Sequence, residues 1–313
     1  MKNNNPIKTL LEQKKHIVID GALASELQRR GCDLNDSLWS AKVLIEQPEL
    51  IQQVHYDYFV AGADCAITAS YQATPMGFAP KGIELEESIK LIKTSVKLAQ
   101  QAKMQYLNDI KQDKALLIAG SVGPYGAYLA NGSEYTGDYQ LSESEFIAFH
   151  KDRVAALIDA GVDILACETM PSFLEIKALA KLIQQFPMVN CWFSLTLKDQ
   201  KHISDGTPLT EVIEYLNSIE QIVSVGINCI ALEKVTTALE VLSKLTSKPL
   251  IVYPNSGEQY DPTTKQWHKN HDHNCTFTNQ LDVWINLGAK LIGGCCQTTP
   301  DDIVEIHQLL NKK

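Results

Sequence analysis

The segment LIDAGVDILACETM (residues 157–170) joins two patterns that recur along this chain. A helical pattern ends on Ala160-Gly161, and Asp163 then leads into an apolar run with little alternation. Glycine supplies the left-handed backbone that a tight turn from helix to strand requires. An apolar run without alternation is typical of a strand buried on both faces of a parallel sheet. The segment YFVAGADCAITASY (58–71) repeats the arrangement, and NLGAKLIGG (286–294) is a looser copy.

Eight such apolar runs alternate with helical patterns. The runs are HIVIDGA (16–22), CAITASY (65–71), LLIAGSVG (116–123), DILACETM (163–170), CWFSLTL (191–197), VSVGINC (223–229), PLIVYPN (249–255) and AKLIGGCC (289–296). Amphipathic helices are expected over 48–62, 85–106, 142–161, 171–186, 210–218, 231–245, 278–287 and 300–310. A (β/α)8 barrel and a doubly wound sheet both satisfy the pattern, and eight repeats in 313 residues favour the barrel. We predict an α/β protein with a (β/α)8 TIM-type barrel, and a single domain over 1–313 because no interior linker interrupts the pattern.

Composition excludes several classes of protein. The chain is 45% hydrophobic with a net charge of -9, and its lysines and arginines are scattered, so we expect no nucleic-acid partner. The apolar stretch near the amino terminus is broken by Lys8, which argues against a signal peptide. No run is long enough to span a bilayer, so we expect no membrane partner. We therefore expect a cytoplasmic protein whose thiols stay reduced.

Three of the eight cysteines stand apart from the rest. Packing alone accounts for Cys32, Cys65, Cys167, Cys191 and Cys275. Cys229 is expected to end the sixth strand, and Cys295 and Cys296 to end the eighth, and a barrel brings all strand ends to one rim. Three thiolates at one rim predict a zinc site with a fourth position open for substrate. Small buried hydrophobes, or a strained vicinal disulfide, are the alternatives.

A zinc ion held by three thiolates suits one kind of chemistry. Its net charge is about -1, which makes it a weak Lewis acid and a poor activator of water for hydrolysis. It is well suited to holding a fourth, incoming thiolate, because metal binding deprotonates a thiol outright. The surplus negative charge keeps that sulfur able to attack a methyl carbon, with no protein acid or base needed beyond the site itself.

Three motifs in this order resemble the homocysteine S-methyltransferase family. They are DGALASEL (20–27), GINC (226–229) and GGCC (293–296), and the resemblance covers about residues 12–310. Other segments are most similar to the members that use S-methylmethionine. These are DSLWSAK (36–42), ITASYQAT (67–74), GSVGPYGAYLANGSEYTGDY (120–139), ACETMPSF (166–173), VYPNSGEQYD (252–261) and GGCCQTTP (293–300).

The resemblance implies a barrel, one zinc ion per chain on Cys229, Cys295 and Cys296, and methionine as product. It assigns the homocysteine amino group to Asp20 and Glu168, and the carboxylate to the amides of Gly21, Ala22 and Leu23. The residue pattern agrees, because Asp20 and Glu168 lie at strand ends on the predicted rim, where a buried ammonium group needs carboxylates. Taken alone, Asp20 also suits a helix cap and Glu168 a surface acid.

Two further segments have both a functional and an ordinary interpretation. The loop GSVGPYG (120–126) lacks the lysine of a phosphate-binding loop, so we interpret it as part of a rim loop. Tyrosines in and after it could close over a cationic sulfonium or could be ordinary loop residues; they are Tyr125, Tyr128, Tyr135 and Tyr139. The histidine-rich stretch 267–275 lacks regular ligand spacing, and we interpret it as a solvated loop.

Two rival functions stay open at this point. A barrel hydrolase would place histidines at strand ends, and none of the eight predicted ends carries one. A thiol or metal-binding protein without catalysis is the other. Within the family, the chain fits small-molecule substrates, homocysteine and a sulfonium donor, with S-methylmethionine expected ahead of S-adenosylmethionine. Oligomeric state is left open.

Overall fold

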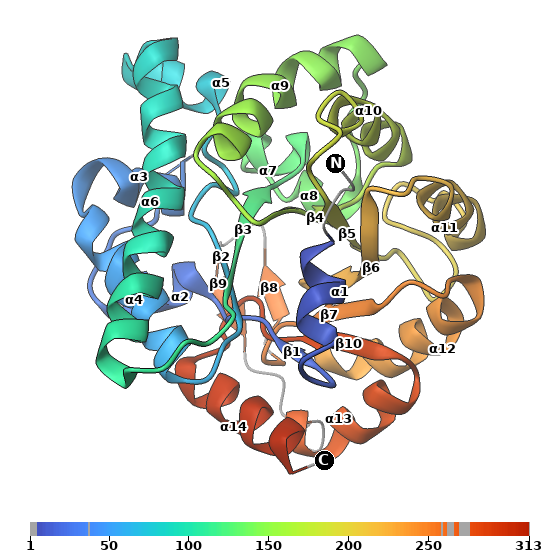
Figure 1. Cartoon of the computed structure of the whole chain (residues 1–313). Coiled ribbons are helices and arrows are strands. Elements are labelled where there is room, and N and C mark those ends of the chain that lie inside the picture. The colour runs from blue at the N-terminus through green and yellow to red at the C-terminus, as the bar shows by residue number, and fades with distance from the viewer. Residues whose placement is uncertain (1–4, 37, 258, 262–265, 269–275, 313) are drawn as a thin grey trace.

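A closed ring of eight parallel strands forms the centre of the computed structural model, which describes residues 5–36, 38–257, 259–261, 266–268 and 276–312 (Figure 1). The strands are β1 (Ile17–Val18), β2 (Cys65–Ile67), β3 (Leu117–Val122), β4 (Ile164–Met170), β5 (Cys191–Leu195), β6 (Ile222–Asn228), β7 (Leu250–Tyr253) and β10 (Ala289–Ile292). Their order is β1-β10-β7-β6-β5-β4-β3-β2. A parallel bridge between Ile19 and Cys65, with Asp20 N donating to Cys65 O at 3.0 Å, joins β1 to β2 and closes the ring. The predicted barrel is confirmed, and the doubly wound sheet is wrong.

One long helix follows each strand on the outside of the barrel. These helices are α4 (Pro48–Val60), α6 (Leu85–Ile110), α9 (Glu143–Asp159), α10 (Phe173–Ile183), α11 (Leu209–Asn217), α12 (Val235–Leu245), α13 (Phe277–Asn286) and α14 (Pro300–Asn311). They match the eight predicted amphipathic patterns, and the signal SESE (142–145) forms a capping box in which Ser142 and Glu145 bond each other's backbone. In the described part of the chain, no helix combines the length and apolarity that crossing a membrane needs.

Shorter elements fill the connections. They are α1 (Pro6–Leu11), α2 (Leu23–Arg29), α3 (Ser40–Glu46), α5 (Pro75–Phe78), η1 (Ala79–Lys81), α7 (Tyr125–Leu129), α8 (Ser133–Thr136) and η2 (Leu232–Lys234). A hairpin of β8 (Gln259–Asp261) and β9 (Gln266–His268) follows β7. The stretch 267–275 was predicted as a loop, which is wrong for Trp267 and His268 because they belong to β9, while 269–275 lie outside the described residues.

The core has two layers that follow the alternation of side chains along the strands. In β4, Ile164 and Ala166 point into the barrel, while Leu165 and Cys167 pack under the helices. The inner layer also contains Ile7 and other residues of α1, which lies across the amino-terminal opening of the barrel (Figure 1). The apolar runs were predicted to be buried on both faces. One face of each strand fills the barrel, and the other packs under the helices.

The aspartates that precede strands at this amino-terminal end accept hydrogen bonds from the neighbouring strand. Asp64 precedes β2, and its Oδ2 accepts a hydrogen bond from Val18 N of β1 at 2.9 Å. Asp163 precedes β4, and its Oδ2 accepts one from Ile118 N of β3 at 2.7 Å. Each carboxylate therefore satisfies the amide of the second residue of the neighbouring strand, which explains why the repeated turn enters its strand through aspartate.

Candidate functional site

The three predicted cysteines lie in the turns that follow two strands, at the carboxyl-terminal end of the barrel. We predicted them as the last strand residues, and this placement is wrong by one to four positions because β6 ends at Asn228 and β10 at Ile292. Cys229 has a left-handed backbone, with φ 52°, which turns the chain sharply out of β6. At Gly293 a Cβ would lie 2.6 Å from Ile19 O, so only glycine lets the loop after β10 approach β1.

These turns bring three thiols together. The sulfur atoms of Cys229, Cys295 and Cys296 all lie within 4.8 Å of one another, and the Sγ atoms of Cys229 and Cys296 are 3.5 Å apart. Hydrogen bonds from Cys295 and Cys296, and one from the Tyr135 hydroxyl at 3.3 Å, hold the pKa of Cys229 well below its ordinary value. The same contacts with Cys229 raise the pKa values of Cys295 and Cys296. Three sulfur donors this close together are the kind of ligand set that a thiophilic metal ion prefers.

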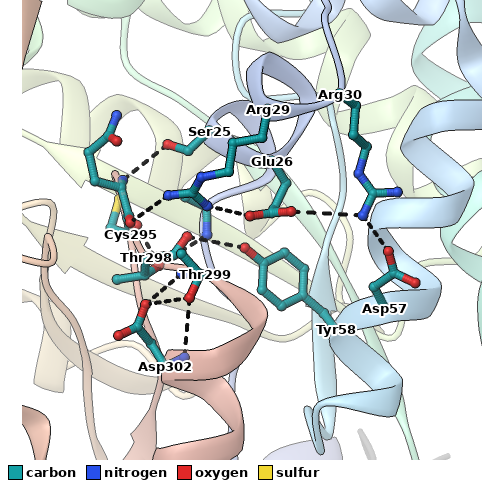
Figure 2. A network of polar contacts seen from close by, with 12 residues as sticks. Ser25, Glu26, Arg29, Arg30, Asp57, Tyr58, Cys295, Thr298, Thr299 and Asp302 are labelled. Carbon is teal, nitrogen blue, oxygen red and sulfur yellow. Dashed lines mark hydrogen bonds and ion pairs between the residues drawn. The ribbon is translucent and has the colours of Figure 1, made fainter.

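A polar network fixes the loop that carries Cys295 and Cys296 (Figure 2). Thr298 Oγ1 donates to Cys295 O at 2.6 Å and accepts from Ala22 N at 3.2 Å. The loop is tied to α2 by Gln297 N, which donates to Ser25 Oγ at 3.1 Å. The network orients the two cysteines before any metal binds, which is the role of hydrogen bonds around a metal site.

Two buried acids face the same cavity. Asp20 is 2% exposed, and its Oδ2 accepts from Ile67 N at 2.9 Å. Glu168 is 7% exposed and hydrogen-bonds with the hydroxyls of Ser121 and Tyr253. Burial raises the pKa of Asp20 well above its ordinary range and raises the pKa of Glu168 to about 7. Neither acid has a lysine or arginine at ion-pair distance among the described residues, so both are suited to a cationic ligand.

Two hydrogen bonds join the end of β4, which carries Glu168, to the end of β6, which Cys229 follows. Asn228 Nδ2 donates to Thr169 Oγ1, and Asn228 Oδ1 accepts from Thr169 N, both at 2.8 Å. Thr169 has φ 60°, in the left-handed region that a threonine rarely adopts. The pair spans β5 and fixes the relative position of the acid and the thiol.

The acids and thiols line one cavity of about 440 Å³. Its wall contains the predicted residues Asp20, Gly21, Ala22, Leu23, Glu168, Cys229, Cys295, Cys296 and Tyr135. The wall also contains Trp39, Tyr71 and Glu134. Acids, thiols and aromatic side chains at the carboxyl-terminal end of a barrel are typical of an active site in this fold.

Comparison with known proteins agrees with this geometry. Residues 17–310 match the sequence model of the family described as homocysteine S-methyltransferase. The chain belongs to the homocysteine S-methyltransferase family. It is 56% identical to the homocysteine S-methyltransferase of Escherichia coli over 98% of this chain and 99% of that protein. It is 52% identical to the homocysteine S-methyltransferase YbgG of Bacillus subtilis over 96% of both. The crystal structure of the Escherichia coli homocysteine methyltransferase MmuM in its metallated form superposes with a TM-score of 0.90, at 53% identity, over 97% of this chain and 100% of that one.

The four tyrosines predicted around the donor of this methyltransferase are not brought together. Tyr135 lines the cavity. The described cavity wall does not include Tyr125, Tyr128 or Tyr139, which pack instead with one another and with aromatic side chains of α9. The Tyr139 hydroxyl donates to Glu175 of α10, which holds that ring away from the cavity. Hydrophobic packing and a buried acceptor therefore account for three of the four tyrosines.

Sequence reasoning missed several residues of the site in this family member. Ser121 of β3 and Tyr253 of β7 bond Glu168, and Thr298 holds the cysteine loop. Ser121 and Tyr253 lie close to the carboxyl ends of their strands, so the barrel pattern could have found them. Glu134 lies on α8, a helix of only four residues between β3 and α9, and no periodic signal in the sequence points to it.

Proposed function

We propose that this chain transfers a methyl group from a sulfonium compound to the thiol of homocysteine in a zinc-dependent reaction that gives methionine. The observation that carries the proposal is the convergence of three cysteine thiols with Asp20 and Glu168 on one cavity. The thiols suit the metal, and the acids suit the ammonium group of an amino acid. A hydrolase is disfavoured because the cavity wall contains no histidine among the described residues.

The cysteine set fits zinc. Three sulfur atoms within 4.8 Å of one another would supply three of the four ligands of a zinc site, and all three cysteines line the cavity from which a substrate would supply the fourth. When bound there, zinc would supply a position at which an incoming thiol is deprotonated and stays electron-rich. We propose Cys229, Cys295 and Cys296 as the ligands, with one ion per chain.

The amino-acid end of homocysteine is proposed to lie along β1 and β4. Asp20 and Glu168 would bind its ammonium group, since each is buried and has no cationic partner among the described residues. Of the three amides proposed for the carboxylate, Ala22 N already donates to Thr298 Oγ1. Gly21 and Leu23 are therefore the stronger candidates for that contact. The homocysteine sulfur would then extend toward the cysteines.

The methyl group is proposed to pass in one displacement. The homocysteine sulfur forms a bond to the methyl carbon, the carbon–sulfur bond of the donor breaks, and the donor leaves as a neutral thioether. Because positive and negative charge cancel in this step, exclusion of water favours it. A cavity of about 440 Å³ lies near the small end of the range for ligand sites, roughly 300–1,000 Å³. That size favours two small amino acids, and so S-methylmethionine before S-adenosylmethionine.

A donor panel tests this function. The zinc-loaded protein is incubated with homocysteine and with S-methylmethionine, S-adenosylmethionine or betaine, and methionine is measured. We expect kcat/KM to be highest with S-methylmethionine, lower with S-adenosylmethionine, and no turnover with betaine. The Cys229→Ser protein serves as the inactive control. No methionine from either sulfonium compound would contradict the proposal, and preference for betaine would contradict the proposed donor class.

A further inference from the structure

Glu134 is an acid in the cavity wall to which the homocysteine site assigns no role. It lies on the short helix α8, and its Oε2 is buried without a hydrogen-bond partner among the described residues. Burying a carboxylate without a partner is unfavourable. A carboxylate that faces a cavity and has no hydrogen-bond partner among the described residues is suited to binding a ligand.

The backbone of Glu134 is held firmly, in contrast to its carboxylate. Thr196 Oγ1 donates to Glu134 O at 3.2 Å. On the other side, α8 packs so closely on Gly126 that a Cβ there would lie 2.6 Å from Glu134 N. The main chain therefore presents the side chain from a fixed position, which is what a recognition residue requires.

Glu134 lies at the end of the cavity that contains the cysteines, where the methyl group is proposed to be transferred. The next residue, Tyr135, contacts Cys229 Sγ at 3.3 Å. The Glu134 carboxylate also lies within electrostatic reach of Cys229 and Cys296. Glu168 also lies within electrostatic reach of Cys229, but its carboxylate already accepts from the Ser121 hydroxyl, as that of Asp20 accepts from Ile67 N. Glu134 Oε2 has no such partner among the described residues.

We propose that Glu134 binds the sulfonium centre of the methyl donor and is a determinant of specificity for cationic donors. This inference rests on the proposed function. The methyl group must reach a sulfur held at the cysteines, so the donor sulfonium must approach the same end of the cavity. The amino-acid end of the donor is several bonds farther away. A buried carboxylate beside the sulfonium attracts it strongly, because the cavity wall has a low dielectric constant.

The charge balance of the reaction predicts which kinetic constant depends on Glu134. The donor binds as a cation at its sulfur and leaves as a neutral thioether, since the electron pair of the broken carbon–sulfur bond stays on that sulfur. The attraction to Glu134 is therefore largest in the bound donor and smaller once the bond has broken. Loss of the carboxylate should therefore raise the donor KM and leave kcat unchanged or slightly higher.

The test compares a cationic donor with a neutral ligand of the same shape. In 2-amino-5-methylhexanoic acid, a carbon atom replaces the sulfonium sulfur of S-methylmethionine. Binding of both compounds to the zinc-loaded protein is measured by calorimetry, and steady-state constants are measured for both substrates. The variants are Glu134→Gln, which keeps the shape, and Glu134→Asp, which keeps the charge. Glu168→Gln is the matched control, with an expected loss of homocysteine affinity instead.

In the Glu134→Gln protein we expect the Kd and KM of S-methylmethionine to rise about 10- to 100-fold. The Kd of the neutral ligand, the homocysteine KM and the zinc content should stay within about twofold, a selectivity that general structural damage would not give. Glu134→Asp should recover part of the donor affinity. Equal losses for the cationic and neutral ligands, or an unchanged donor KM, would overturn the inference. If the unmodified protein uses no sulfonium donor, the proposed function itself fails.

Discussion

Both ends of the barrel bury carboxylates, but the two ends differ in whether those carboxylates are paired with cationic side chains. At the amino-terminal end, the side chain of Asp64 is 0% exposed and pairs with Lys14 and with Lys114, the latter at 3.2 Å. At the carboxyl-terminal end, Glu168 has hydroxyl partners only, and Glu134 has a buried oxygen with no partner among the described residues. The first end neutralises its buried charge within the protein, and the second leaves it for ligands.

This difference separates stability from function. An ion-paired acid that also accepts a strand amide stabilises the closed barrel, because removing it leaves several groups unsatisfied at once. An acid without a cationic partner makes the empty protein less stable and the liganded protein more stable. Substitutions at the carboxyl-terminal end should therefore reduce binding and turnover, whereas substitutions at the amino-terminal end should reduce the free energy of unfolding.

The largest effect is expected for Cys229→Ser. Cys229 supplies the thiolate with the lowest pKa of the cluster, so its loss should abolish stable zinc binding and lower kcat/KM by about 10³-fold or more. Zinc content is measured by atomic emission after dialysis. Cys32→Ser is the matched control, since this thiol lies outside the cavity wall and should leave zinc content unchanged. Full zinc retention in the Cys229→Ser protein would mean that the metal site is elsewhere.

A smaller effect, of the opposite kind, is expected for Asp64→Ala. The substitution removes the partner of two lysines and of Val18 N, and it should lower the free energy of unfolding by about 2–4 kcal/mol. Urea unfolding measures it, and the KM values of both substrates should stay within about twofold. Asp163→Ala makes the matched comparison, because this exposed carboxylate bonds Ile118 N in the same way and its loss should cost about 1 kcal/mol. Equal destabilisation by the two variants would show that the two lysine pairs of Asp64 contribute no more than the single 3.9 Å pair of Asp163 with Lys103.

The fold was predictable from the sequence because the length and periodicity of its apolar segments show where strands and helices are buried. All eight apolar runs contain a strand, and turns such as Ala160-Gly161 mark where helices end. The runs could not give the strand ends, since Cys229 and the glycines before Cys295 leave the sheet through special backbone geometry and not through a change in hydrophobicity. The helix α1 was missed because it is only 6 residues long and buries two apolar side chains.

The candidate site was predictable where topology alone brings residues together. Cys229, Cys295 and Cys296 could be assigned to one rim because every parallel strand of a barrel ends there. Glu134 could not be found, because Tyr135 and Cys229 are 94 residues apart and only the folded loop brings α8 to the cysteines. For the same reason the sequence could not separate Tyr135, which reaches the cavity, from Tyr139, which bonds Glu175.

The smallest expected difference between the two ends is a pH dependence of the free energy of unfolding in the metal-free protein. Burial raises the pKa of Glu168 from an ordinary 4.5 to about 7. The folded state therefore holds this proton over a pH range in which the unfolded state has lost it. The stability contributed by the protonated form is complete below about pH 4.5 and is lost as the pH rises through about 7.

Glu168→Gln removes that titration while keeping the shape of the side chain. We expect the difference in unfolding free energy between the unmodified protein and this variant to change by on the order of 1–3 kcal/mol between pH 5 and pH 8, with the unmodified protein losing stability. Urea unfolding in the presence of a chelator gives both values. Saturating homocysteine in the zinc-loaded protein should reverse the trend, because a bound ammonium group stabilises the carboxylate form. The same difference at both pH values would mean that Glu168 is already ionised in the empty cavity, and the contrast with the ion-paired Asp64 would then rest on hydrogen bonding alone.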